Sequence, residues 1–501
     1  MSSNLLTLDM GTSSLHCMVT DACATPLASV STPMTYSTPA GASELTLEFQ
    51  PQGVMDAMGK LVAQALGNAR LSGSSVKAIG ITGQRQGMVF LGRGGGEVMA
   101  SPNLDLRAVF QGAALDEELE NGVYRITGHF PTMLLAPARL RWLQENKPQD
   151  YEDLDYLLTV PGWVAYRLTG NRVCERSLAA AAGLLEVSSQ SRPPEIMDKL
   201  GVPPELLPPL TRAGDVLGGL APALAQEWGL EPGIPVTLAG ADTQCGLLGM
   251  GLVRDGDIGV VAGWSCALQV LTPTPCYDDG MSTWVGCSLH ENLWVSEANL
   301  GDSGNAQAWL KDTIFGQGVS WEEAQQAANQ APSGSGEILC YLGQGPQSAP
   351  KARLKRGGIL FPTPLSYRRP DPGQALRAFW EGLAFSLKAN LDQLHRVTGL
   401  GNGAIHLGGG MARSTTFSAI LADVVGRVVH LSPEAQVSGH GAALAASVAA
   451  GHHDSLESAV QTLSAKEKRL EPNGASSLEY QEHYQQWQTI YNRLQDDSLG
   501  R

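Results

Sequence analysis

The stretch LLTLDMGTSSLHCMVTD, residues 5–21, is the part of the sequence from which the fold can be inferred. Two runs of strand-forming residues, 5–8 and 16–20, flank a glycine-led turn, and this pattern predicts a β-hairpin. The first strand ends at Asp9, and the turn consists of Gly11, Thr12, Ser13 and Ser14. Such a turn can direct N–H and O–H groups at one anion, and the carboxylate beside it can hold Mg²⁺ through water. The alternative is that glycine, serine and threonine are here only because they favour turns.

Length and composition limit the classes of protein to consider. A chain of 501 residues is too long for one core, so we expect two to four domains. A hydrophobic content of 43% with 17% charged residues excludes general disorder. The formal charge of -15 argues against a general binder of nucleic acids or acidic membranes. An anionic substrate would therefore need a local site.

The cysteines and the apolar segments indicate the cellular compartment. None of the eight cysteines forms a C-x-x-C pair, so neither a zinc knuckle nor a disulfide scaffold is expected. No basic start leads into an apolar segment, and no apolar run has membrane-spanning length. We expect reduced thiols, a cytoplasmic protein and no nucleic-acid or membrane partner. A homodimer remains open.

Further along, the chain alternates strands and helices and then repeats its opening. Residues 50–71 have the apolar spacing of a helix, and the apolar strand 77–84 follows. Residues 255–272 repeat the order strand, glycine-containing turn, strand, which predicts two similar halves. Residues 404–431 give strand, glycines, helix and strand, an order that presents a helix N-terminus to an anion or nucleotide. The aromatic stripe of the last helix predicts docking onto its own domain.

Four motifs in this order resemble the FGGY carbohydrate kinases. They are DMGTSS at 9–14, AGADTQCG at 239–246, GGMARSTTFSAILADVVGRVV at 409–429 and QVSGHGAALAA at 436–446. The resemblance covers nearly the whole chain. It implies an α/β fold of two actin-like, ribonuclease-H-like domains, with an ATP and sugar cleft between them. We expect the domains to span residues 1–248 and 249–501.

The resemblance also implies roles for individual residues. Asp242 would be the general base that takes the proton of the attacking hydroxyl, and Asp9 would hold Mg²⁺ through water. One strand-end carboxylate facing a metal-bound triphosphate suits phosphoryl transfer, which depends on positioning and charge stabilisation. The alternative for Asp242 is a helix N-cap. The predicted ATP contacts are Gly11, Thr12, Ser13, Ser14, Gly263, Ser265, Gly304, Gly409, Gly410 and Ser414.

Five polar residues match family positions that face the acceptor. A site that hydrogen-bonds several hydroxyls discriminates by leaving its groups unpaired with the wrong ligand, which suits a polyol. The alternative for the arginine is a surface ion pair. The predicted substrate contacts are Gln84, Arg85, Gln86, Asp105 and Gln244.

Some positions depart from the family pattern. His16 replaces the usual Arg or Lys beside the first turn, and Trp264 stands where a phosphate-contacting Thr is usual. Leu134 stands where glycerol kinases have a Tyr, and QRQG at 84–87 replaces the QMHG of xylulokinases. NLDLRA at 103–108 looks more like the autoinducer kinases.

The sequence therefore predicts an ATP-dependent and magnesium-dependent kinase of a small sugar or polyol, similar to xylulokinase. An autoinducer-type dihydroxypentanedione or another open-chain polyol is the alternative acceptor. A sugar-binding and nucleotide-binding regulator without catalysis is the rival from another class. An actin-like chaperone ATPase fits less well, because nothing resembling a peptide-binding β-domain follows the nucleotide-binding halves.

Overall fold

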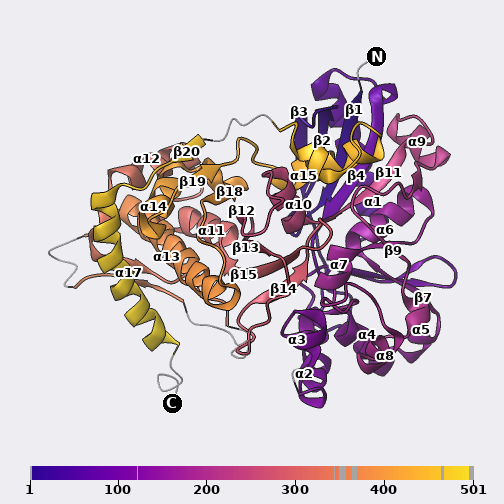
Figure 1. Ribbon diagram of the computed structural model, residues 1–501, viewed down its shortest axis with the longest axis horizontal. Coiled ribbons are helices and arrows are strands. Elements are labelled where there is room, and N and C mark those ends of the chain that lie inside the picture. Colours follow the sequence, from indigo (N-terminus) through magenta and orange to yellow (C-terminus); the bar gives the residue numbers. More distant parts are fainter. Residues whose placement is uncertain are drawn as a thin grey trace.

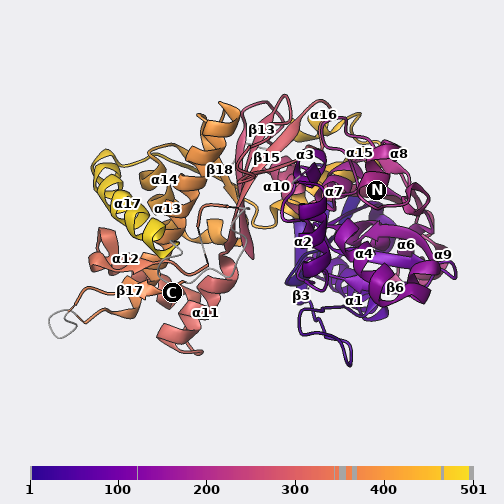
Figure 2. The same cartoon turned by 90° about the horizontal axis from the view of Figure 1, so that it is seen from below.

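The computed structural model describes residues 3–120, 122–343, 345–348, 357–363, 369–463 and 468–495. The chain forms two lobes side by side, with the N-terminal half on the right of Figure 1 and most of the C-terminal half on the left. Each lobe is built around one large sheet. The underside in Figure 2 shows the two lobes meeting along a line near α10 and β15.

The sheet of the N-terminal half begins with the predicted hairpin. Strand β1 pairs antiparallel with β2 on one side and parallel with β4 on the other, and it is buried along its whole length. The strands, in sheet order, are β10 (Gly218–Gly219), β11 (Pro235–Ala241), β4 (Val76–Gly83), β1 (Asn4–Met10), β2 (Ser14–Asp21) and β3 (Pro26–Pro33).

The sheet of the C-terminal half repeats this pattern. Strand β12 pairs antiparallel with β13 and parallel with β18, as β1 does with β2 and β4. The two similar halves and the predicted α/β class are thereby confirmed. The strands, in sheet order, are β14 (Trp284–Cys287), β15 (Trp294–Asp302), β13 (Ser265–Thr272), β12 (Ile258–Ala262), β18 (Ile405–Gly408), β19 (Val429–Leu431) and β20 (Lys468–Leu470).

Helices with an apolar stripe cover these sheets. In the C-terminal half, α13 (Pro372–Thr398) buries its leucine stripe in the largest core, beside α14 (Thr415–Val425). The last helix, α17 (Gly474–Leu494), packs its aromatic residues into the same core, so its predicted docking is confirmed. In the N-terminal half, α1 (Pro51–Ala69) and α6 (Val160–Thr169) bury their apolar residues together with β1.

Shorter elements complete the chain. Strands β5 and β6 form an antiparallel hairpin around the glycine-rich turn at 93–96, and residues 177–185 are buried. The remaining N-terminal elements are β5 (Met88–Gly92), β6 (Glu97–Ser101), α2 (Val109–Glu118), α3 (Gly122–Thr127), α4 (Ala136–Asn146), α5 (Pro148–Glu152), β7 (Leu154–Thr159), β8 (Cys174–Glu175), α7 (Arg176–Ala181), α8 (Pro194–Lys199), β9 (Leu210–Thr211) and α9 (Pro222–Trp228). The remaining C-terminal elements are α11 (Gly304–Phe315), α12 (Trp321–Gln330), β16 (Leu339–Cys340), β17 (Ile359–Leu360) and α16 (Leu456–Val460).

Two helices at the junction of the halves pack with almost no space between them. Helix α10 (Asp242–Gly249) lies against α15 (Val437–Ala449), and a Cβ added at Gly441 would lie 1.9 Å from the carbonyl oxygen of Cys245. A Cβ added at Gly80 of β4 would lie 2.4 Å from the carbonyl oxygen of Ala442. Helix α15 therefore packs on the sheet of the N-terminal half, although it comes late in the chain (Figure 1). The predicted domain boundary after residue 248 therefore stays a prediction.

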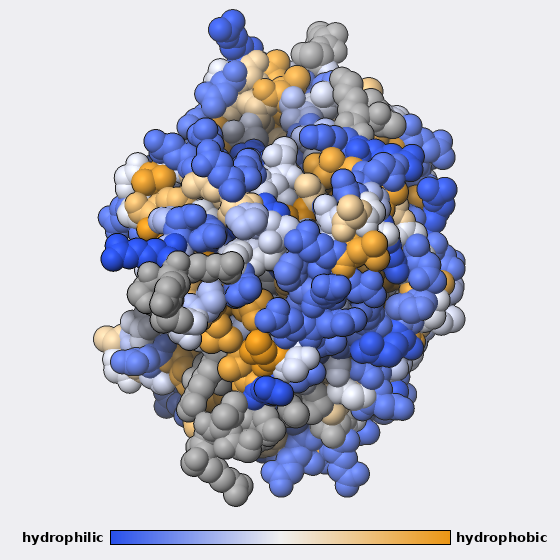
Figure 3. Space-filling model, turned by 90° about the vertical axis from the view of Figure 1, so that its left-hand side faces the viewer, coloured by the Kyte–Doolittle hydropathy of each residue, from blue (hydrophilic) through white to orange (hydrophobic). Residues whose placement is uncertain are grey.

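Within the described ranges, no helix combines the length and apolar character needed to cross a bilayer. Figure 3 views the outer end of the C-terminal half, where hydrophilic residues cover most of the face and apolar residues lie between them. All eight cysteines are free thiols, and six are buried.

Candidate active site

Asp9 lies at the end of β1, between His16 of β2 and Thr82 of β4 in the strand register. Its side chain is buried, and its Oδ1 atom has no hydrogen-bond partner among the described residues. Burial raises the pKa of Asp9 to about 7. A buried carboxylate oxygen without a protein partner fits the predicted role of holding hydrated Mg²⁺, since this ion keeps several waters.

The turn after Asp9 is fixed by hydrogen bonds within the hairpin and by one from Asn103. The Gly11 N–H donates to the carbonyl of Ser14 at 3.0 Å, and the Asn103 amide donates to the Thr12 hydroxyl at 2.8 Å. The Ser14 hydroxyl lies 2.7 Å from Nε2 of His16. Burial lowers the pKa of His16, so its imidazole is neutral at pH 7. The turn thus offers hydroxyl and N–H donors without a formal positive charge from His16.

Asp242 is the first residue of α10 and follows β11 directly. Its side chain remains 28% exposed, and its Oδ1 atom lies 3.8 Å from Nε of Arg85. Burial of the carboxyl raises the pKa of Asp242 to about 7; Arg85 lowers it, and Asp9 raises it. The helix N-cap is Ala241, so the alternative interpretation of Asp242 as the N-cap is wrong.

The backbone before Asp242 is held by two hydroxyls. Gly240 has a φ of +116°, and its carbonyl accepts a hydrogen bond of 2.8 Å from the Thr82 hydroxyl. The Ala241 N–H donates to the Ser177 hydroxyl at 3.0 Å, and that hydroxyl donates to the buried Glu175 carboxylate. This support fixes the Asp242 carboxylate relative to the strand end.

Arg85 does not form a surface ion pair, so the alternative interpretation of this residue is wrong. Its side chain is buried and donates two hydrogen bonds, of 2.6 and 2.9 Å, to the carboxylate of Glu297. Glu297 lies on β15 of the C-terminal half, so the pair crosses between the lobes. The sequence prediction missed Glu297; the available signal was an acidic residue in the middle of the strand WVSEANLGD.

The other predicted acceptor residues divide into two groups. Gln86 has a φ of +65°, and its amide nitrogen has no partner among the described residues, as expected of a group kept for a ligand. Gln244 lies on the first turn of α10, two residues after Asp242.

Gln84 and Asp105 are enclosed by protein. Gln84 accepts a hydrogen bond of 2.7 Å from the Asn103 N–H, and Asp105 accepts one of 2.7 Å from Nε of Arg107. Neither side chain has exposed surface, so the predicted direct contact of these two with the acceptor does not fit the structure. Both residues match family positions in the sequence, but hydrogen bonds with nearby residues engage both side chains.

The predicted adenosine and second phosphate residues meet at one cavity of about 700 Å³. Gly263, Gly304, Gly410 and Ser414 line it, and Gly304 begins α11 as expected. A Cβ at Gly304 would lie 2.4 Å from the carbonyl oxygen of Gly263, so the second turn and α11 are in close contact. The sequence prediction missed the α12 side chains in this lining: Trp321, Glu322, Gln325, Gln326 and Asn329.

The two residues that flank this cavity are placed by backbone geometry. Ser265 begins β13 and pairs with Asp302. Gly409 has a φ of +98°, and a Cβ there would lie 2.4 Å from the carbonyl oxygen of Ala262. Only glycine suits position 409, because its φ lies in the left-handed region and an added Cβ would meet backbone atoms.

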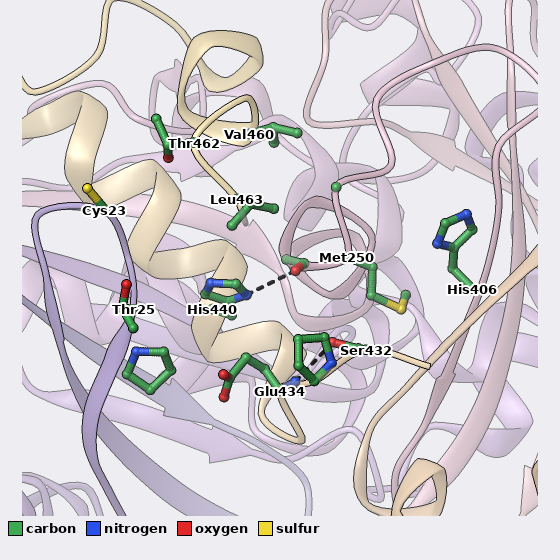
Figure 4. Close-up of a pocket in the computed structure, with 14 residues that line it drawn as sticks. Cys23, Thr25, Met250, His406, Ser432, Glu434, His440, Val460, Thr462 and Leu463 are labelled. Carbon is green, nitrogen blue, oxygen red and sulfur yellow. Dashed lines mark hydrogen bonds between the residues drawn. The ribbon is translucent and has the colours of Figure 1, made fainter. Parts of the chain in front are cut away.

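A second cavity, of about 370 Å³, lies at the junction of the halves (Figure 4). Cys23 and Thr25 line it from the N-terminal half, and His406 and Glu434 line it from the C-terminal half. His440 of α15 donates from Nδ1 to the Gly249 carbonyl at 3.0 Å, shown as a dashed line. None of the predicted site residues lines this cavity, so it is separate from the catalytic groups.

Two ribonuclease-H-like lobes, a strand-end carboxylate and a glycine-lined cavity in the other lobe together define a two-domain phosphotransferase. Comparison with known proteins identifies the family. The model of the N-terminal domain of the FGGY family of carbohydrate kinases matches residues 4–249, and that of the C-terminal domain matches residues 259–450. The chain belongs to this family and is a carbohydrate kinase, an enzyme class that uses ATP as its phosphoryl donor.

Named relatives and solved structures agree with this assignment. The chain is 27% identical over 456 residues to an autoinducer-2 kinase of Klebsiella pneumoniae, covering 88% of this chain and 84% of that protein. It is 26% identical to an autoinducer-2 kinase of Yersinia pseudotuberculosis, covering 99% and 94%. The structure of a xylulose kinase from Lactobacillus acidophilus superposes with a TM-score of 0.86 at 20% identity, covering 99% of both chains. The last comparison shows the fold alone.

Proposed function

We propose that this protein transfers the γ-phosphoryl group of Mg·ATP to a hydroxyl of a small sugar or polyol, with Asp242 as the general base. The observation that carries the proposal is the position of Asp242 at the end of β11, 3.8 Å from Arg85. A pKa of about 7 suits a base that must be ionised near neutral pH yet accept a proton.

Each half would hold one part of the reaction. Asp242 would accept the proton of the attacking hydroxyl, while Arg85 orients the acceptor beside it. The donors of residues 11–14 and the turn at 263–265 would hold the phosphates, and the cavity along α12 would take the nucleoside. Catalysis would come mostly from this positioning. Gly263 in the second turn would allow the backbone to approach the phosphates closely.

Asp9, with Asp242 nearby, would hold Mg²⁺ through water, and the ion would neutralise charge on the transferring phosphates. In the part of the chain that the structure describes, no group of three or more His, Cys, Asp or Glu side chains could hold a metal ion. That agrees with an ion that arrives with ATP and uses few protein ligands.

The acceptor we favour is a short open-chain molecule with several adjacent oxygens. The two named relatives are autoinducer-2 kinases and match over 84% and 94% of their length. This supports an autoinducer-type dihydroxypentanedione, whereas the fold likeness to a xylulose kinase keeps a ketopentose as the second candidate. The free thiols support a cytoplasmic enzyme. The split at residues 248 and 249 is proposed as its domain boundary.

The test is a coupled assay that measures ADP release from Mg·ATP. The acceptors offered are dihydroxypentanedione, ketopentoses, alditols, glycerol and erythritol. We expect one acceptor to support turnover, and Asp242→Asn to lower kcat by about 100-fold to 10,000-fold because the general base is lost. In the wild type, log kcat/KM for the acceptor should rise with pH and level off above about 7, as Asp242 ionises.

The outcome that contradicts the proposal is equally specific. Asp242→Asn with more than a tenth of wild-type turnover would remove Asp242 as the base. Stabilisation by an acceptor without turnover on any compound would favour the regulator. Asp279→Asn serves as a control. The Asp279 carboxylate forms an exposed ion pair with Arg125, so this substitution should not affect kcat.

A further inference from the structure

Strand β14 belongs to the sheet of the C-terminal half, but it is bonded to the N-terminal half. The Val285 N–H donates to the Gly128 carbonyl at 2.8 Å, and the Trp284 indole N–H donates to the Phe130 carbonyl at 2.8 Å. Just before the strand, the Tyr124 hydroxyl donates to the Thr283 carbonyl at 2.9 Å. We call these three hydrogen bonds the β14 clamp.

The backbones at the clamp are in direct contact. Gly128 has a φ of +71°, and a Cβ there would lie 2.0 Å from the carbonyl oxygen of Val285. A larger residue would therefore push β14 away from the N-terminal half. Because β14 is also the edge strand of its own sheet, it links the two lobes through backbone as well as side chains.

Polar side chains lie opposite one another on one face of this sheet. In the strand register, Glu297 of β15 faces Trp284 of β14 on one side and Gln269 of β13 on the other. Directly opposite residues have Cβ atoms about 5 Å apart and share a face. Both amide atoms of Gln269 lack partners among the described residues, although its side chain is fully buried. This face therefore holds polar groups where a core would be apolar.

The same face meets the acceptor side of the N-terminal half. Glu297 holds both terminal nitrogens of Arg85, which leaves Nε directed to Asp242. The guanidinium also lies 5.7 Å from the centre of the Trp284 ring. The centre of the His129 ring also lies 5.3 Å from the centre of the Trp284 ring.

His129 adds a defined hydrogen-bond acceptor. Burial lowers the pKa of His129 to about 4, so the ring is neutral at pH 7. Its Nδ1 lies 2.8 Å from the Thr127 carbonyl, and only a protonated nitrogen can bond there. Nε2 is therefore unprotonated and can accept a hydrogen bond from a hydroxyl.

We propose that the C-terminal half supplies one wall of the acceptor pocket, in which Glu297 is the positioning residue for Arg85. The β14 clamp holds this wall against the N-terminal half before any nucleotide binds. This inference rests on the proposed function and deepens it. The acceptor then meets Arg85, Trp284 and neutral His129 in a pocket already assembled, which suits a molecule with both hydroxyl donors and oxygen acceptors.

The kinetic test compares Glu297→Gln with a matched control, Glu381→Gln. Both glutamates are almost fully buried and bonded to an arginine, but Glu381 pairs with Arg377 inside the C-terminal half. We expect Glu297→Gln to raise the KM for the acceptor about tenfold or more, because Arg85 loses its charged partner. The KM for ATP should stay within about twofold. Glu381→Gln should lower Tm and leave the acceptor KM unchanged.

The binding test is calorimetry with the acceptor identified by the kinase assay, without nucleotide. We expect the wild type to bind that acceptor alone, and Trp284→Phe, which removes the indole N–H of the β14 clamp, to bind it several-fold more weakly. Trp284→Phe also tests the wall if Glu297→Gln fails to fold.

The outcomes separate the two proposals. A wild-type enzyme that turns over an acceptor, with Glu297→Gln and Trp284→Phe both unchanged in acceptor affinity, overturns the inference and leaves the proposed function. Acceptor binding that requires a nucleotide analogue overturns the preassembled pocket. Absence of turnover on every acceptor counts against the proposed function instead.

Discussion

Burial of the Asp9 carboxyl lowers the stability of the folded, ligand-free protein. The carboxylate is buried, lacks a partner on Oδ1 in the described part of the chain, and has a pKa raised to about 7 by that burial. A carboxyl with a raised folded pKa binds protons more tightly in the folded state. Its ionisation therefore destabilises the free protein as pH rises from about 4 to 7.

This predicts that Asp9→Asn stabilises the ligand-free protein while it lowers activity. At pH 8 without Mg²⁺ or nucleotide, we expect the free energy of unfolding to rise by about 1 to 4 kcal/mol, since one pKa unit corresponds to about 1.4 kcal/mol. The gain should be smaller at pH 5, where Asp9 is largely protonated. Denaturant unfolding at the two pH values measures this difference.

Asp105 provides the contrasting control. Its buried carboxylate is bonded to Arg107, so Asp105→Asn should destabilise the protein at both pH values. A loss of stability for Asp9→Asn at pH 8 would contradict the assignment of Asp9 as an unpaired carboxylate. An unchanged Mg²⁺ titration of activity in Asp9→Asn would contradict its metal role.

Trp321 is the exposed one of two tryptophans that line the cavity of about 700 Å³, for which we propose nucleoside binding. It begins α12, lines the cavity beside Gln325 and is 41% exposed. Stacking of a base on an aromatic ring contributes about 1 to 3 kcal/mol. We therefore expect Trp321→Ala to raise the KM for ATP roughly tenfold without changing the acceptor KM, measured by initial rates with each substrate varied.

Trp309 of α11 is the matched control, because it is 58% exposed and is not among the residues that line the cavity. Trp309→Ala should leave both KM values unchanged. Equal effects of the two substitutions would mean that Trp321 acts on folding and not on nucleotide binding.

The sequence could identify catalytic residues only where a motif marks them. Asp9, the last but one residue of β1, and Asp242, directly after β11, lie inside quoted motifs, and their carboxylates are close enough to interact. Gln84 and Asp105 also matched, but their partners Asn103 and Arg107 enclose them. Glu297 could not be predicted as the partner of Arg85, because 212 positions separate the two.

Among the elements, the second phosphate turn depends on glycine at the start of α11. A Cβ on Gly304 would lie 2.4 Å from the carbonyl oxygen of Gly263, and neither atom is at the end of a flexible side chain. Gly304→Ala should therefore displace the turn and raise the KM for ATP about tenfold or more, while acceptor binding by calorimetry stays unchanged.

Gly318, in the loop between α11 and α12, allows a direct comparison. A Cβ added there would meet no atom within 4 Å, so Gly318→Ala should behave as wild type. Wild-type kinetics in Gly304→Ala would mean that the turn at 263–265 does not determine nucleotide affinity.

The predictability of elements depended on whether local pattern and environment agreed. The hairpin of β1 and β2 and the aromatic helix α17 have strong patterns, and both were predicted. Strand β3 was missed because it is an edge strand with alternate exposure and prolines at both ends. Strand β7 was missed because its short run of 154–159 directly follows a polar stretch.

At the scale of the molecule, the contact of α10 with α15 lies at the junction of the lobes, and we expect the lobes to rotate about it. Their backbones approach so closely that a Cβ at Gly249 would lie 2.1 Å from the Val437 carbonyl oxygen. Such a contact permits rotation more readily than separation. The β14 clamp fixes a second point, so any closure must bring the nucleotide side toward the acceptor side.

We therefore expect closure to follow nucleotide binding. In small-angle X-ray scattering, the radius of gyration should fall when Mg²⁺ and a non-hydrolysable ATP analogue are added, and the acceptor alone should change it little. AMP is the control, since it lacks the phosphates that join residues 11–14 to the turn at 263–265. A decrease caused by the acceptor alone would contradict this order.

The fold class and the order of the two halves could be predicted from the sequence, because the repeated hairpin at 5–21 and 255–272 is visible in it. The packing of α15 on the sheet of the other half could not, since it depends on matching small residues at Gly80, Ala442 and Gly441 across the junction. Neither could the cross-lobe position of β14.

The cross-lobe position of β14 and β15 also bears on how such a kinase could diverge. The proposed base Asp242 begins α10 and the proposed metal carboxylate Asp9 lies on β1, whereas Trp284 and Glu297 lie on the hairpin of β14 and β15 elsewhere in the chain. A lineage that altered or exchanged residues 283–297 would change which compound is accepted and leave the phosphorylating machinery intact. Substrate preference in this branch would then drift with a segment of about fifteen residues, and recombination at that segment would be the shortest route to a new metabolic role.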